Sequence, residues 1–164
     1  MDGSASITVT HAPFSWRHDS SVPDFTDTGT IAVMDGECVL CMAGARLIDT
    51  FDKGATVGIC PAQTPLGTAL LAHFGMSPDD PETWLVLDAG KVHESLDAII
   101  HLGRCIGGIG WLLQVFRILP RPARDWLYRR IARNRYAFFA RRKTCTLPTP
   151  SLRKRLIEPM PSGA

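Results

Sequence analysis

Short apolar runs, each closed by a turn signal, recur along the first two thirds of the chain. Runs of about four to eight apolar or β-branched residues that end at Gly, Pro or Asp are typical of buried strands. Three segments fit this description, residues 31–34, 56–60 and 84–87, and residues 92–95 are the expected partner strand of the third. Only the turn Asp88-Ala89-Gly90-Lys91 separates the last two segments, which predicts an antiparallel hairpin.

Longer stretches with helical spacing of apolar positions lie between and after these runs. We expect helices at residues 38–53, 66–74 and 96–105, and Gly54 and Gly75 are stop signals for the first two. The order is therefore strand, helix, strand, helix, strand, strand, helix. Such alternation predicts an α/β fold in which helices flank a mixed sheet with an antiparallel edge.

The remaining segments differ from this core in character. Residues 1–28 are rich in Ser, Thr, Asp and Pro, and predict a mobile leader ahead of a core at residues 29–110. Helical stretches at residues 111–119 and 123–142 predict an extension, residues 111–143, packed on the core. Residues 144–164 contain four prolines and predict a tail.

Composition fits one domain, but the charge is divided unevenly along the chain. The 164 residues are 45% hydrophobic, which is enough for one core. Residues 1–110 carry five Lys/Arg and fourteen Asp/Glu, whereas residues 111–164 carry thirteen and two. The acidic part and the basic part can attract one another within the fold, or the basic part can attract an acidic partner.

Several features favour a cytoplasmic location. The N-terminal residues lack the basic start and apolar core of a secretory signal. The longest apolar stretch, residues 109–119, is interrupted by Gly110, Gln114 and Arg117, and is too short to span a bilayer. Five cysteines with uneven spacing do not suggest a secreted disulfide framework.

Cys38 and Cys41 carry the chemistry that the sequence suggests most strongly. They follow a strand and a turn at the expected start of a helix, where unpaired N–H groups and the helix dipole favour a thiolate. On a helical wheel, Cys41 lies at the edge of an apolar arc, and Cys38 points away from it. The arc consists of Leu40, Ala43, Gly44, Leu47, Ile48 and Phe51. We therefore predict that Cys38 is the exposed attacking thiol and Cys41 the shielded resolving thiol.

A zinc site is the alternative for this pair. A Cys-x-x-Cys needs two further ligands, and the chain has neither a second such motif nor a His-x-x-x-His. The other candidate ligands are scattered: Cys60, Cys105, Cys145, His73, His93 and His101. Packing can bring scattered residues together, so zinc stays open, although we predict no metal. We also predict no cofactor, because residues 107–110 lack a phosphate-binding glycine pattern.

Residues 33–41, VMDGECVLC, resemble the signature of the DCC family of thiol-disulfide oxidoreductases, named for Asp-x-x-Cys-x-x-Cys. The resemblance continues through residues 84–88, 94–98, 119–120 and 128–136, and covers about residues 31–142. It implies a thioredoxin-like fold with Asp35, Cys38 and Cys41 as the motif residues. Met34 is a small departure, because family members often carry Tyr or Phe there. Thioredoxin-like folds also place a cis-proline before the third strand, and Pro81 lies near that position.

Two roles for Asp35 follow from its chemistry. It can accept and return the proton of Cys41, as a general acid and base would. It can instead only shape the turn, since Asp-Gly is common in turns. The sequence does not separate these two roles.

Residues 123–142 predict a basic amphipathic helix. Aromatic and aliphatic residues share one face and arginines the other, which favours a surface helix docked on the sheet. Peripheral membrane contact is a second interpretation. We predict no nucleic-acid binding, since the aromatic and basic residues lie on opposite faces.

Together these features predict an enzyme, a protein-disulfide reductase that acts on a disulfide-bearing protein or a small thiol. A reducing partner such as the thioredoxin or glutathione system would regenerate it, because the cytoplasm favours reduction. The alternative is a non-catalytic binding module. In that case the basic helix would hold a membrane or partner, and the cysteine pair would be structural or zinc-bound.

Overall fold

A computed structural model describes residues 11–77, 84–138 and 149–160. Its centre is a four-stranded sheet in the order β2-β1-β3-β4. The strands are β1 (Thr30–Met34), β2 (Val57–Pro61), β3 (Trp84–Asp88) and β4 (Lys91–Glu94). β1 is parallel to β2 and antiparallel to β3, which is in turn antiparallel to β4. The predicted mixed sheet with an antiparallel edge is confirmed.

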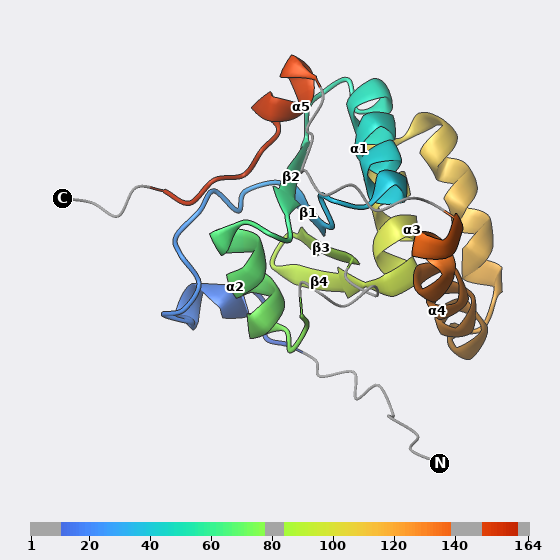
Figure 1. The fold of residues 1–164 in the computed structure, drawn as a ribbon, viewed down its shortest axis with the longest axis horizontal. Helices are drawn as coiled ribbons and strands as arrows, with labels where there is room; N and C mark the ends of the chain where they lie inside the picture. The colour runs from blue at the N-terminus through green and yellow to red at the C-terminus, as the bar shows by residue number, and fades with distance from the viewer. Residues whose placement is uncertain (1–10, 78–83, 139–148, 161–164) are drawn as a thin grey trace, which may run out of the picture.

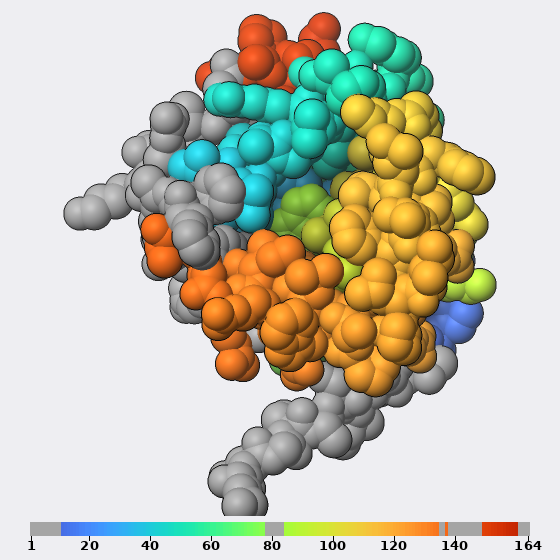
Figure 2. Space-filling view, turned by 90° about the vertical axis from the view of Figure 1, so that its right-hand side faces the viewer, coloured from blue at the N-terminus to red at the C-terminus, as the bar shows by residue number. Residues whose placement is uncertain are grey.

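Helices cover both faces of the sheet (Figure 1). The described helices are η1 (Ser15–His18), α1 (Val39–Phe51), α2 (Pro65–His73), α3 (Ser95–Ile106), η2 (Gly108–Ile118), α4 (Arg121–Phe138) and α5 (Pro150–Lys154). α1 and α3 lie on one face and α2 on the other (Figure 1). η2 and α4 extend the first of these layers, where Figure 2 shows them beside α1. This arrangement is the expected thioredoxin-like α/β fold with a C-terminal helical extension.

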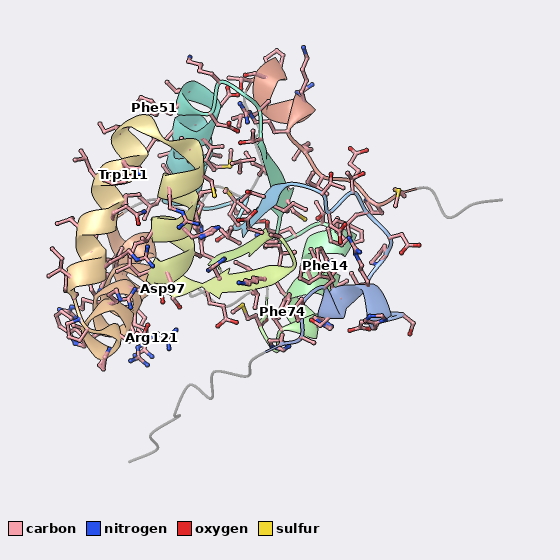
Figure 3. All side chains as sticks on the ribbon, turned by 180° about the vertical axis from the view of Figure 1, so that it is seen from behind. Phe14, Phe51, Phe74, Asp97, Trp111 and Arg121 are labelled. Atoms are coloured by element: carbon pink, nitrogen blue, oxygen red, sulfur yellow. The ribbon has the colours of Figure 1, made fainter. Side chains whose placement is uncertain are left out.

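Side chains that alternate along the strands build one hydrophobic core on each face. Ala32, Met34, Ile59 and Val86 pack with α1, α3 and α4, whereas their strand neighbours pack with α2. Figure 3 shows the same division, with Phe51 and Trp111 on one side of the sheet and Phe14 and Phe74 on the other. The alternation follows from the strand geometry, which points successive side chains to opposite faces.

The predicted mobile leader is wrong for its described part, residues 11–28. Trp16, Val22 and Phe25 are buried against α2 and the sheet. The Trp16 indole N–H also donates to Asp27 Oδ2 at 2.9 Å. These apolar residues are isolated within a polar segment, so no periodic pattern predicted their burial. The first ten residues lie outside the described part of the chain.

The predicted tail is likewise packed over residues 149–160. Leu152 is fully buried, and Ile59 of β2 exchanges backbone hydrogen bonds with Arg155 and Ile157. These hydrogen bonds pair the backbone groups of Ile59 on the outer edge of β2, which would otherwise be open to another strand.

Ion pairs join the acidic and basic parts of the chain, as the charge division suggested. Arg155 contacts Asp49 at 3.0 Å and Asp52 at 2.7 Å, and Arg124 pairs with Asp97. Within the described residues, none of the helices has both the length and the apolarity needed to cross a bilayer.

Candidate active site

Three segments converge at one edge of the sheet, where β1 ends. Met34, the last residue of β1, lies opposite Pro61 of β2 on one side and Trp84 of β3 on the other. The N–H of Ala62 donates to the Met34 carbonyl at 2.8 Å and extends this pairing beyond the strands. The turn after β1, the loop after β2 and the start of β3 therefore lie together.

Cys38 and Cys41 occupy the start of α1 at this edge. Cys38 is the N-cap residue, and Cys41 lies in the first turn three positions later. Both residues therefore belong to the N-terminal end of α1. The first N–H groups of α1 have no partner within the helix, and no acidic residue occupies its first turn. The pair therefore lies in the positive end of the helix dipole.

Both thiols are buried, which corrects the prediction that Cys38 is exposed. Cys38 is 0% exposed and Cys41 is 3% exposed. The wheel failed at Cys38 because the N-cap backbone is extended, with φ −82° and ψ 123°, so helical angles do not apply to it.

The wheel also misplaced the buried face of α1 itself. The buried residues of this helix are Cys41, Ala45 and Ile48, whereas Leu47 and Phe51 are exposed. Cys41 therefore lies within the buried face and not at its edge, and its predicted shielding is observed.

Trp84 contacts the cysteine pair directly, although the sequence did not single it out. Its indole N–H donates to Cys41 Sγ at 3.2 Å within the core. The Trp84 ring lies beside Gly44, one turn after Cys41, where a Cβ would be 3.5 Å from the ring, an ordinary van der Waals contact. A donor to sulfur favours its charged form, so this hydrogen bond would stabilise a thiolate at Cys41.

Asp35 shapes the turn that leads into α1. It is 2% exposed, and its Oδ1 accepts the Glu37 N–H at 2.9 Å and the Gln63 amide at 2.8 Å. Gln63 Oε1 in turn accepts the Gly36 N–H at 3.0 Å. The turn-shaping role of Asp35 is therefore observed.

Gln63 is a second site residue that sequence reasoning missed. It lies two residues after the end of β2, and the carboxyl ends of parallel neighbours meet at one edge. The predicted order of strand, helix and strand was the signal that could have identified it, because such units form parallel neighbours.

The other described cysteines lie away from a helix N-terminus, Cys60 in β2 and Cys105 near the end of α3. Burial raises the pKa of the Cys60 thiol to about 11. Burial is also the main cause of the raised pKa of Cys105. Cys145 and Pro81 lie outside the described residues.

A separate polar cluster lies near the other end of β1. Donor atoms of Asp88, His101 and Cys105 lie within 4.8 Å of one another, close enough to hold a metal ion. The Asp88 carboxylate already bonds His101 at 2.7 Å and Thr30 at 2.9 Å. Burial raises the pKa of Asp88, but these hydrogen bonds outweigh that effect and hold it below its ordinary value. In the described part of the chain, the cysteine pair does not belong to a group of this kind.

Comparisons with known proteins identify the family of the chain. A family model for DCC1-like thiol-disulfide oxidoreductases matches residues 32–141. The uncharacterized protein YuxK of Bacillus subtilis is 31% identical over 127 residues, which are 77% of this chain and 93% of YuxK. A chloroplastic DCC family protein of Arabidopsis thaliana is 26% identical over 141 residues, which are 85% of this chain and 82% of that protein. No solved structure matches the chain significantly.

Proposed function

We propose that this chain, which belongs to the DCC1-like thiol-disulfide oxidoreductase family, is an enzyme that exchanges dithiol for disulfide through Cys38 and Cys41. One observation carries the proposal: Cys38 is the N-cap of α1, and Cys41 in the first turn accepts a hydrogen bond from Trp84. A helix terminus and a buried donor to sulfur both favour the thiolate, the reactive form in exchange.

Exchange would proceed in two steps. The Cys38 thiolate attacks one sulfur of a substrate disulfide, forms a mixed disulfide and releases the other sulfur as a thiolate that takes up a proton. Cys41 then attacks Cys38 Sγ, releases the reduced substrate and leaves a Cys38–Cys41 disulfide. Two electrons have passed from the enzyme to the substrate. The assignment of Cys38 as attacker rests on its position at the helix terminus.

A reductase needs an electron donor and a reducing compartment. We propose that a dithiol of the thioredoxin type or glutathione reduces the Cys38–Cys41 disulfide, and that the enzyme works in the cytoplasm. The substrate would be a disulfide-bearing protein or a small disulfide, and the proposed role involves no nucleic acid.

Asp35 would assist by moving the proton of Cys41, in addition to shaping the turn. An Asp35→Asn substitution retains the shape and the acceptor oxygen for the Glu37 N–H but cannot exchange a proton near neutral pH. We expect slower exchange and an altered pH profile, with unchanged thermal stability. An unchanged exchange rate and pH profile would show that Asp35 only shapes the turn.

Burial of both thiols favours a second candidate, a binding module with a structural cysteine pair. Cys38 and Cys41 are at most 3% exposed, so a substrate reaches them only if the surrounding elements open locally. If local opening limits the reaction, urea below the unfolding transition will accelerate alkylation of Cys38 while the circular dichroism stays constant. A purely structural pair would become reactive only with global unfolding.

A redox titration of the purified protein tests the enzymatic proposal. We expect Cys38 and Cys41 to interconvert between dithiol and disulfide as the ratio of reduced to oxidised glutathione is varied, read by alkylation and mass spectrometry. Cys41→Ser should trap a mixed disulfide on Cys38, whereas Cys38→Ser should trap none. Cys105→Ser is the matched control and should titrate like the parent protein. A pair that stays reduced at every ratio, or a stoichiometric zinc ion bound to it, would refute the proposal.

A further inference from the structure

η2 is an unusually long 3₁₀ helix, and its geometry sorts its side chains into rows. It spans 11 residues, whereas runs beyond about four residues are uncommon for this helix type. A 3₁₀ helix has about three residues per turn, so residues three apart lie one above another. Each row therefore faces one direction along the whole element.

The inward row holds η2 against α3. Gly110 and Gly103 meet so closely that a Cβ on either would lie 2.5 Å from the carbonyl oxygen of the other. A Cβ on Gly103 would also lie 2.8 Å from the Leu113 side chain, and Phe116 packs on the core. Gln114, from the next row, donates to the Ile100 carbonyl at 2.8 Å. These contacts fix the rotation of η2 about its own axis.

The outward row consists entirely of aliphatic residues. Ile109, Leu112, Val115 and Ile118 follow one another at intervals of three, and are 58%, 69%, 57% and 83% exposed. An α-helix would spread these positions around its circumference, because each step of three residues falls short of a full turn. The 3₁₀ form instead aligns them in one row that the packing of η2 keeps in solvent.

Further exposed aromatic and aliphatic residues lie in the same two neighbouring elements, η2 and α4. Trp111 is 65% exposed, and Trp126 and Ile131 of α4 are 63% and 49% exposed. Figure 2 shows η2 and α4 side by side on one face of the molecule. We name the set the η2–α4 surface: Ile109, Trp111, Leu112, Val115, Ile118, Trp126 and Ile131. Large exposed apolar patches mark sites of interaction.

Arginines accompany the apolar residues in the same two elements. Residues 108–138 carry seven arginines and one acidic residue, Asp125. Arg117, Arg121 and Arg130 are exposed. Apolar side chains with tryptophan beside a strong positive charge are the combination with which helices bind at the interface of an anionic bilayer.

We propose that the η2–α4 surface docks the protein on the headgroup region of an anionic lipid bilayer. The aliphatic row would enter the boundary between headgroups and acyl chains, the tryptophans would lie at headgroup level, and the arginines would contact lipid phosphates. A second copy is a poorer occupant, because a two-fold interface would bring the arginines of both chains together. The proposal goes beyond thiol-disulfide exchange and is independent of the cysteine pair.

Co-sedimentation with vesicles tests this proposal on the full chain. We compare vesicles of phosphatidylcholine alone with vesicles that contain about one third phosphatidylglycerol. The parent protein should bind the anionic vesicles at least about tenfold more tightly, and salt should weaken that binding. Leu112→Ser combined with Ile118→Ser should weaken it at least about tenfold, because two membrane-buried aliphatic side chains are lost. Arg117→Gln should weaken it about fivefold.

Met160→Ser is the matched control, since Met160 is 50% exposed and lies outside the η2–α4 surface. It should bind like the parent protein, and circular dichroism should show every variant folded. Absence of binding to anionic vesicles, or parental binding by the Leu112/Ile118 double variant, would overturn the proposal. A dimer would also overturn it, if analytical ultracentrifugation showed that the parent protein dimerises without binding vesicles and that the double variant is monomeric. The occupant of the surface would then be a second copy.

Discussion

The Trp84 side chain affects both the chemistry of Cys41 and the packing of α1. Its N–H donates to Cys41 Sγ, and its ring lies against Gly44 of the same helix. The hydrogen bond stabilises the reduced thiolate more than the disulfide, because a charged acceptor forms the stronger bond. The contact with Gly44 depends only on the shape of the ring. A substitution that keeps an aromatic ring but removes the N–H separates the two effects.

Trp84→Phe should make the reduction potential of the pair more negative by about 20 mV. A lost hydrogen bond of about 1 kcal/mol destabilises the dithiol form relative to the disulfide, and about 30 mV corresponds to 1.4 kcal/mol for two electrons. Titration in glutathione buffers measures the shift. Trp16→Phe removes a comparable indole bond on the opposite face, to Asp27, and should leave the potential unchanged. Equal shifts in the two variants would show that the bond to Cys41 is not the cause.

At the scale of elements, α1 and α2 each contain a glycine, but the space around the two differs. A Cβ at Gly44 would meet the Trp84 ring at 3.5 Å, an ordinary van der Waals contact. A Cβ at Gly67 would lie 2.2 Å from the Pro61 carbonyl oxygen and 2.9 Å from Ala62 Cα. Both obstacles at Gly67 are backbone atoms, so the start of α2 would have to move away from β2.

Gly44→Ala should raise the free energy of unfolding by about 1 kcal/mol, because alanine favours the helix and finds room. Gly67→Ala should lower it by about 2 kcal/mol, because the clash outweighs the same gain in helix propensity. Urea unfolding followed by circular dichroism measures both. Changes of the same sign in the two variants would contradict the packing described here.

At the scale of the whole molecule, Arg155 connects the C-terminal segment to α1 and β2. Its guanidinium contacts Asp49 and Asp52, and it also donates to the Asp52 carbonyl at 2.7 Å. Asp52 is buried, and burial alone would raise its pKa. Hydrogen bonds from Val57, Arg155 and Thr56 outweigh burial and hold the pKa below its ordinary value of 3.8.

Arg155→Met should lower the free energy of unfolding by about 3 kcal/mol at neutral pH, because it leaves Asp52 charged and buried. A carboxyl whose pKa is lowered by folding contributes stability above its unfolded value, and this is lost as the pH falls through the folded value. The difference between variant and parent should therefore shrink below about pH 4. Thermal unfolding across this range tests the prediction. Arg153→Gln, an exposed change in α5, should have little effect, and a pH-independent loss in Arg155→Met would contradict the role of Asp52.

The sequence by itself determined the local features of this protein. Alternation of apolar residues, turn residues and helix stops are local signals, so the order of strands and helices and the position of Cys41 in a first turn could be predicted. The charge division along the chain likewise indicated ion pairs such as Arg155–Asp52, although not their partners.

Only the tertiary structure decided which distant residues meet. Cys38 is buried because the N-cap backbone leaves the helical path, and Gln63 and Trp84 reach the site because β2 and β3 both pair with β1. The burial of Trp16 and Leu152 has the same origin, since each fills a gap between elements far away in sequence. Such contacts depend on how complete elements pack, and no periodic pattern in the sequence predicts that packing.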